Sequence, residues 1–289
     1  MERLQSYTLL CRTPLSLFAA CSAGAGFLLG PHQSAARALL PVTAVFLLAC
    51  GASALNQYQE QDIDAKMERT RGRPLPSGVI SRRQAAASSS ALIVGGLSLL
   101  AFTGSMAAAT LGVFAVLWYN GAYTRLKRIT AFAAVPGAVV GMAPPAIGWV
   151  ASGGDAADRR LFAVCFLFFL WQVPHFWLQV LHHGEEYEQA GLPSLTQVLT
   201  KRQLARVTFV WLCAAAAAGL LLPLYGAVTS PVLSYSLLPP AAWIVLQGLR
   251  IMNEHGAPKR SLSAFRHLNV YIVFVMVLLS VERIFSPVP

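Results

Sequence analysis

The chain has 289 residues, of which 56% are hydrophobic and only 12% are charged. Soluble domains carry roughly 25% charged residues, so this composition excludes an ordinary soluble domain and predicts a polytopic membrane protein. The formal net charge is +10, which we interpret as membrane topology together with affinity for anionic lipid or a phosphorylated substrate, and not as nucleic-acid binding.

Apolar stretches that can cross a bilayer, which requires about 20 residues each, recur along the whole chain. They lie near residues 14–31, 38–56, 85–104, 106–123, 131–151, 161–181, 207–227, 229–249 and 268–285. We therefore predict an all-α membrane protein, a bundle of about nine transmembrane helices that forms a single integral-membrane domain over residues 1–289. Glu282 and Arg283 interrupt the last stretch, and the two stretches around Gly104 share almost no linker.

The basic residues predict the orientation of the bundle. If the N-terminus is inside, 18 of the 22 Lys and Arg residues fall in the inner segments. Cytoplasmic loops are enriched in Lys and Arg, so we predict a cytoplasmic N-terminus and an outer C-terminus.

The first apolar-to-polar boundary carries a regular set of oxygen ligands. Asn56, Glu60 and Asp64 recur every four residues, which places them in a stripe on one face of an α-helix, whereas Asp62 would point elsewhere. Carboxylate and amide oxygens suit Mg²⁺, which is usually held together with substrate phosphates. The pattern thus predicts a metal and diphosphate site, although a solvated helix end with loop charges would carry similar residues.

Basic residues adjoin these acids in two inner segments, residues 66–78 and 123–130. Arginine offers a planar fork for phosphate oxygens and lysine a point charge, while a basic loop beside a span is also a general topology signal. The candidate phosphate contacts are Lys66, Arg69, Arg73, Tyr123, Lys127 and Arg128.

A second acidic segment follows the 161–181 stretch. Seven of the twelve acids lie in two inner segments, with Glu60, Asp62, Asp64 and Glu68 in the first and Glu185, Glu186 and Glu188 in the second. His182 and Glu186 are one helical turn apart if the helix continues, so the segment could form a second metal-binding wall that faces the first. A polar interfacial loop is the alternative interpretation.

These segments together resemble the UbiA superfamily of intramembrane prenyltransferases, and most closely its branch that farnesylates protohaem IX. The resemblance extends over most of the chain and is carried by residues 56–64, the R-P-L-P-S-G turn at 73–78, and residues 123–128, 144–149, 171–176, Tyr187 and 190–193.

The resemblance implies a UbiA-like helical bundle in a bacterial cytoplasmic (inner) membrane. It implies that farnesyl diphosphate binds through Mg²⁺ to Asn56, Glu60, Asp64 and Glu186, that the diphosphate ionises, and that a vinyl group of protohaem IX attacks the allylic cation. His175 is the candidate contact to haem, and Tyr187 belongs to the same substrate site. Membrane lipid and contact with haem-copper oxidase assembly or haem A synthase are the further partners implied.

The chain departs from the family pattern at residues that bear on the chemistry. Glu60 and Glu186 stand where the pattern has aspartate, and the asparagine expected after Thr130 is missing. Three alternatives are therefore retained: a UbiA-type prenyltransferase for a quinone precursor or another aromatic, a non-catalytic haem-binding assembly protein, and a transporter. Transporters usually carry ionisable groups near the bilayer midplane, whereas the stretches before residue 268 contain no Asp, Glu, Lys or Arg.

Overall fold

The described part of the chain is entirely helix, turn and loop. The computed structural model describes residues 2–31, 35–254 and 257–285, and within them there is no strand. The helices in chain order are α1 (Glu2–Leu10), α2 (Thr13–Leu29), α3 (Ala35–Gln59), α4 (Gln61–Asp64), α5 (Arg82–Phe102), α6 (Met106–Val116), the π-helix η1 (Leu117–Tyr123), α7 (Thr124–Leu126), α8 (Ala134–Gly137), α9 (Val139–Ala151), α10 (Arg159–Gln189), α11 (Leu195–Val198), α12 (Lys201–Leu221), α13 (Pro231–Ser236), α14 (Leu238–Asn253) and α15 (Pro258–Phe285). The predicted all-α class is confirmed.

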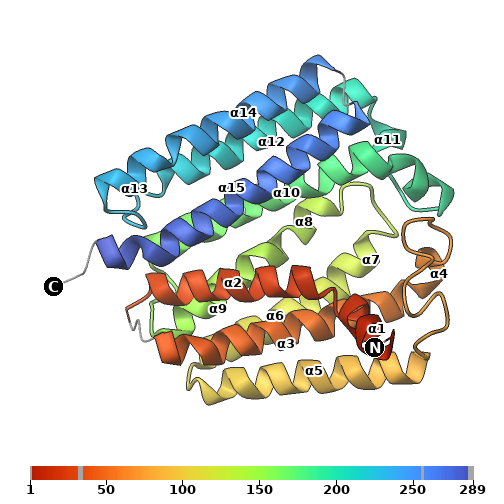
Figure 1. Cartoon of the computed structure of the whole chain (residues 1–289), viewed down its shortest axis with the longest axis horizontal. Coiled ribbons are helices and arrows are strands. Elements are labelled where there is room, and N and C mark those ends of the chain that lie inside the picture. Colours follow the sequence, from red (N-terminus) through yellow and green to blue (C-terminus); the bar gives the residue numbers. More distant parts are fainter. Residues whose placement is uncertain (1, 32–34, 255–256, 286–289) are drawn as a thin grey trace.

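Each of the nine predicted apolar stretches contains helix, in agreement with a bundle of about nine spans. In the described ranges, seven helical segments are long and apolar enough to cross a membrane, and α2 is a shorter apolar helix. The 106–123 stretch is divided between α6 and η1. The beginning of α1 and the end of α15 lie at opposite ends of the bundle (Figure 1), as an odd number of spans requires.

The last helix begins ten residues before the predicted stretch, and Glu282 does not interrupt it. α15 begins at Pro258 and passes through Glu282 without a break. The Glu282 carboxylate is buried and accepts hydrogen bonds from Thr229 N (2.5 Å), Thr229 Oγ1 (2.6 Å) and Ser230 N (3.1 Å). Hydrogen bonding offsets the cost of burying a polar group, so Glu282 joins α15 to the start of α13.

Two groups of helices enclose the centre of the bundle (Figure 1). Helices α2, α3, α5, α6 and α9 pack on one another in one group, and α10, α12, α14 and α15 pack in the other. Contacts of α9 with α10 and of α2 with α15 join the groups. The short helices α1, α4, α7 and α11 lie toward the same end, on the right in Figure 1.

Helices α2 and α9 approach each other closely through glycine. A Cβ atom at Gly148 would lie 1.8 Å from the Ala23 carbonyl oxygen, and one at Gly26 would lie 2.1 Å from the Pro145 carbonyl oxygen. Small residues let membrane helices approach at backbone distance. This contact fixes one wall of the space between the two helix groups.

Candidate active site

A cavity of about 640 Å³ lies between the two helix groups, lined by residues of α2, α3, α9, α10 and α15 among others. This volume is within the range of pockets that bury a small-molecule ligand. The lining changes along α3 and into α4, from Val45 and Leu48 to the acids Glu60 and Asp64. The cavity therefore has apolar walls and a charged mouth at the end of the bundle that carries α4.

The first motif is helical but is not one continuous helix. α3 ends at Gln59, Glu60 has φ −107° and ψ 11°, and α4 begins at Gln61. Backbone hydrogen bonds from Glu60 N to Asn56 O (2.9 Å) and from Asp64 N to Glu60 O (2.8 Å) still follow helical spacing. The single predicted helix is therefore wrong at residue 60, but the four-residue spacing is kept across the break, and both Glu60 and Asp64 line the cavity.

Both buried acids of the first motif form ion pairs with predicted phosphate contacts. Lys127 Nζ lies 2.5 Å from Glu60 Oε1. Arg73 Nη1 donates to Asp64 Oδ1 (2.7 Å) and Oδ2 (2.6 Å). Lys127 also lies 5.1 Å from the Tyr123 ring centroid. The cations and acids are thus gathered at one mouth and neutralise each other.

Asn56 is fully buried, and its amide is held on both sides. Its Nδ2 donates to Thr124 Oγ1 (3.0 Å), and its Oδ1 accepts from Arg12 Nη2 (3.2 Å). Asn56 does not itself line the cavity. The candidate amide ligand is therefore oriented by two residues that the sequence did not place at the site.

Arg12 is the main site residue that the sequence did not indicate, because it counted only as one of the 18 basic residues in the inner segments. It lines the cavity, and its backbone is left-handed, with φ 45° and ψ 52°, which is uncommon for a residue other than glycine. The pKa of Arg73 is lowered mainly by burial and secondly by repulsion from Arg12, although attraction to Asp64 opposes this effect. Two guanidinium groups that repel each other at one mouth create a field that favours a bound anion.

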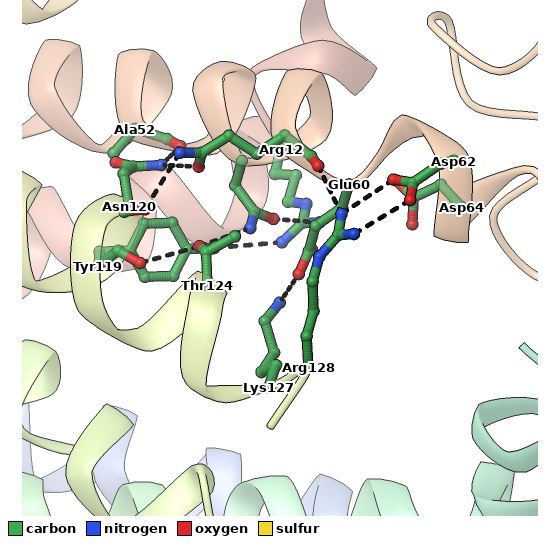
Figure 2. Close-up of polar contacts among 12 residues, drawn as sticks. Arg12, Ala52, Glu60, Asp62, Asp64, Tyr119, Asn120, Thr124, Lys127 and Arg128 are labelled. Atoms are coloured by element: carbon green, nitrogen blue, oxygen red, sulfur yellow. Dashed lines mark hydrogen bonds and ion pairs between the residues drawn. The ribbon is translucent and has the colours of Figure 1, made fainter. Parts of the chain in front are cut away.

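The π-helix η1 holds the end of α3 in place (Figure 2). Asn120 Nδ2 donates to the Ala52 carbonyl (2.9 Å), and Gln59 Nε2 donates to the Asn120 carbonyl (3.1 Å). Segments of π-helix are rare and often occur at functional sites. The sequence predicted a plain helix here and gave no signal for this network.

The second motif differs from the prediction in its local structure. His183 has φ −119° and ψ 15° and kinks α10, so His182 and Glu186 are not on one regular turn. Glu186 Oε1 lies 3.5 Å from His183 Nδ1. Its Oε2 is buried without a hydrogen-bond partner in the described part of the chain, and Glu186 does not line the cavity.

The two motif segments nevertheless meet. Ile63 and Met67 of the first segment pack with Leu192 of the second, and Tyr187 packs against them. Tyr187 and Leu192 also line the cavity. The structure thus brings the two acid-bearing segments to the same mouth, as the sequence predicted.

The remaining basic candidates are divided between the mouth and the outer surface. Arg69 is exposed and lines the cavity, whereas Lys66 is exposed and lies outside its lining. Arg128 binds Asp62 through Nη1 (3.0 Å) and Nη2 (2.9 Å) and also lies outside the lining. These hydrogen bonds lower the pKa of Asp62. Asp62 is exposed and lies outside the cavity lining, whereas Glu60 and Asp64 are buried and line it.

The donor set at the mouth fits Mg²⁺ that arrives with a phosphorylated substrate. Across residues 2–31, 35–254 and 257–285, no three His, Cys, Asp or Glu side chains form a group that could hold a metal ion. Mg²⁺ is usually bound by one or two carboxylates plus substrate phosphates and not by an all-protein cage. The buried carboxylates of Glu60 and Asp64 at the cavity mouth meet that requirement.

The fold and the mouth define an intramembrane prenyltransferase. The chain belongs to the UbiA prenyltransferase family, which it matches over residues 17–270.

Among its relatives are proteins named protoheme IX farnesyltransferase. The one from Geobacter sulfurreducens is 43% identical over 217 residues, which is 75% of this chain and 80% of the relative. The one from Nitratidesulfovibrio vulgaris is 36% identical over 282 residues, which is 97% of this chain and 96% of the relative.

Solved structures share the fold at low sequence identity. The apo structure of a UbiA homologue from Aeropyrum pernix K1 has a TM-score of 0.77 at 21% identity, covering 93% of this chain and 98% of its own. A UbiA homologue from Archaeoglobus fulgidus bound to GPP and Mg²⁺ has a TM-score of 0.66 at 16% identity, covering 95% of this chain and 99% of its own.

Proposed function

We propose that this protein transfers a farnesyl group from farnesyl diphosphate to a vinyl group of protohaem IX, forming haem O. The observation that carries the proposal is one cavity with apolar walls and a mouth where Glu60, Asp64, Arg73 and Lys127 meet. That arrangement suits a substrate with an anionic head and an apolar tail. The acceptor is inferred from the names of the relatives that span most of the chain.

The residues at the mouth have complementary roles in this proposal. Asn56, Glu60, Asp64 and Glu186 would hold Mg²⁺, which supplies Lewis-acid stabilisation of the charge that grows on the leaving diphosphate. Arg73 and Lys127, with Arg69 at the rim, would bind phosphate oxygens, and Lys66 and Arg128 would add positive charge from outside the cavity lining. Glu186 has a buried Oε2 without a hydrogen-bond partner among the described residues, which supports its inclusion.

The apolar walls of the cavity would shield the reacting carbon of the farnesyl group from bulk water. Apolar residues such as Phe18, Val45 and Leu48 line the cavity beyond the mouth, where the farnesyl tail would lie. A site that excludes bulk water limits hydrolysis of the allylic cation before transfer, and the one water molecule that the product contains is needed only after the vinyl group has been alkylated. Tyr123 and Tyr187 border the cavity near this boundary and would contact the substrate where head and tail meet.

His175 supports a haem acceptor. It lies in α10, lines the cavity and is surrounded by aromatic rings. A neutral imidazole is a common iron ligand, so His175 would hold protohaem at the wall opposite α3.

The test is transfer by the purified protein in lipid nanodiscs. Farnesyl diphosphate, Mg²⁺ and haem b are expected to give a product heavier than haem b by one farnesyl group and one hydroxyl group, because water adds to the vinyl carbon that is not alkylated. Asp64→Asn should abolish the product, and Gly72→Ala, at an open position on the adjoining loop, should retain it. Product from a quinone precursor but none from haem b would assign the alternative acceptor, and haem binding without any product would assign a non-catalytic assembly role.

We also propose that the mouth faces the cytoplasm of a bacterial inner membrane, since 18 of 22 Lys and Arg residues fall on that side of the predicted topology. Single cysteines introduced at Lys66 and at Arg160 should react with a membrane-impermeant reagent from opposite sides. Labelling of both from one side would contradict this orientation. From the resemblance to the UbiA branch that farnesylates protohaem IX, we also propose that haem A synthase or the haem-copper oxidase assembly machinery receives the product.

A further inference from the structure

The ring of His175 is fixed by groups from two helices. Its centroid lies 4.9 Å from that of Trp171 and 5.6 Å from that of Phe176, both in α10, and 4.7 Å from that of Phe265 in α15. On the α15 side, His175 Nδ1 lies 2.9 Å from Asn269 Oδ1. The imidazole is therefore held in position and orientation while it borders the cavity.

A second hydrogen bond sets the register of the two helices at this level. The indole Nε1 of Trp171, one turn before His175, donates to the carbonyl oxygen of Leu268 in α15 (3.1 Å). Leu268 immediately precedes Asn269. The bond between His175 and Asn269 is therefore part of a helix contact that holds the two side chains opposite each other.

The partner atom decides which ring nitrogen can bind iron. A neutral imidazole has one N–H donor and one lone-pair acceptor. Asn269 is oriented with Oδ1, which can only accept, against Nδ1. In this orientation the hydrogen bond selects the tautomer in which Nδ1 carries the proton and Nε2 keeps its lone pair. Metal-binding histidines generally donate their second ring N–H to a carboxylate, carbonyl or water, which fixes the tautomer and raises ligand basicity.

We propose that Asn269 is a positioning residue for acceptor binding: it holds His175 in the Nδ1–H tautomer so that Nε2 binds the iron of protohaem IX. This inference rests on the proposed function. The carboxamide on α15 gives that helix a role in acceptor selection, which neither sequence motif indicates. Asn269 itself lines the cavity and would lie beside the porphyrin edge.

The experiment measures haem binding apart from transfer. Wild-type protein in nanodiscs is titrated with ferric haem b in the absence of farnesyl diphosphate, and the Soret band and electron paramagnetic resonance spectrum report the axial ligand. Asn269→Leu, which has similar size and no acceptor oxygen, should weaken haem binding about 10-fold or more and change the axial-ligand spectrum. Asn269→Asp, which keeps the acceptor oxygen, should retain the histidine-ligated spectrum.

Two further variants make the result specific. His175→Ala should lose the axial signature. His267→Ala removes a histidine of α15 that lies outside the cavity lining and bonds to the Ser263 carbonyl (2.8 Å), and it should leave both affinity and spectrum unchanged.

The outcomes separate this inference from the proposed function. If Asn269→Leu keeps the wild-type spectrum and affinity, or if His175→Ala keeps the axial signature, the positioning role is wrong even where haem farnesylation persists. If wild-type protein binds haem through His175 but makes no farnesylated haem, the proposed reaction fails while the positioning role stands.

Discussion

The ion pair between Lys127 and Glu60 should make the protein bind Mg²⁺ poorly by itself. The two side chains are 24% and 9% exposed, and Lys127 Nζ lies 2.5 Å from Glu60 Oε1, so Mg²⁺ must displace a cation to reach this carboxylate. At an effective dielectric constant of about 20, two charges about 4 Å apart attract by about 4 kcal/mol. When Mg²⁺ replaces Lys127 beside Glu60, its own attraction to the carboxylate offsets only part of this energy, because Mg²⁺ also loses bound water. We therefore expect Lys127→Met to improve the binding free energy of Mg²⁺ by about 1–3 kcal/mol, which is about 5–150-fold in affinity.

The same substitution should have the opposite effect on the diphosphate, because Lys127 is then no longer available to a phosphate oxygen. Calorimetric titration of detergent-purified protein with Mg²⁺ alone, and with inorganic diphosphate in the presence of Mg²⁺, measures both effects. Arg128→Met is the matched control: it removes the neighbouring positive charge, but its partner Asp62 lies outside the cavity lining, and the pair is 40% and 62% exposed. The reasoning is refuted if Lys127→Met leaves Mg²⁺ affinity within twofold of wild type, or if Arg128→Met raises it equally.

Three further outcomes are expected. Asp64→Ala should remove turnover while the protein still inserts and purifies, and near-normal turnover at saturating substrate and Mg²⁺ would contradict a metal-side role. If Glu60 and Glu186 share one ligand network, the effects of Glu60→Asp and Glu186→Asp on the activation free energy should be non-additive by roughly 0.5–3 kcal/mol. Strictly additive effects in a double-mutant cycle would show that the two glutamates do not act at one site. Gly148→Ala should lower stability by about 1–3 kcal/mol through overpacking, because its Cβ would lie 1.8 Å from a backbone oxygen. A thermal unfolding scan compares this variant with Gly72→Ala, whose added Cβ would meet nothing within 4 Å. Equal unfolding midpoints for the two variants would show that α2 and α9 can separate without loss of stability.

The sequence by itself determined the class of fold and the types of residue that gather at the mouth. Long apolar stretches must form helices in lipid because every backbone polar group has to be satisfied internally, and this requirement depends only on local composition. The spacing of Asn56, Glu60 and Asp64 is equally local. Glu60 and Asp64 both line the cavity although the helix breaks at Glu60, whereas Asn56 lies outside the lining. The meeting of the two acidic segments followed from placing both at inner ends of spans.

Tertiary structure alone decided how those groups are connected. Arg12 contacts Asn56 across 44 residues of chain and Asn269 contacts His175 across 94, and no periodicity within a segment encodes such a pairing. Two further features overrode predictions made from one segment: the kink at His183, and the burial of Glu282, which is held by hydrogen bonds from Thr229 and Ser230. Residue types and helical spacing are local properties, whereas the partner of a buried charge is set by which helices pack together. That is why candidate ligands could be predicted from the sequence but their ion pairs could not.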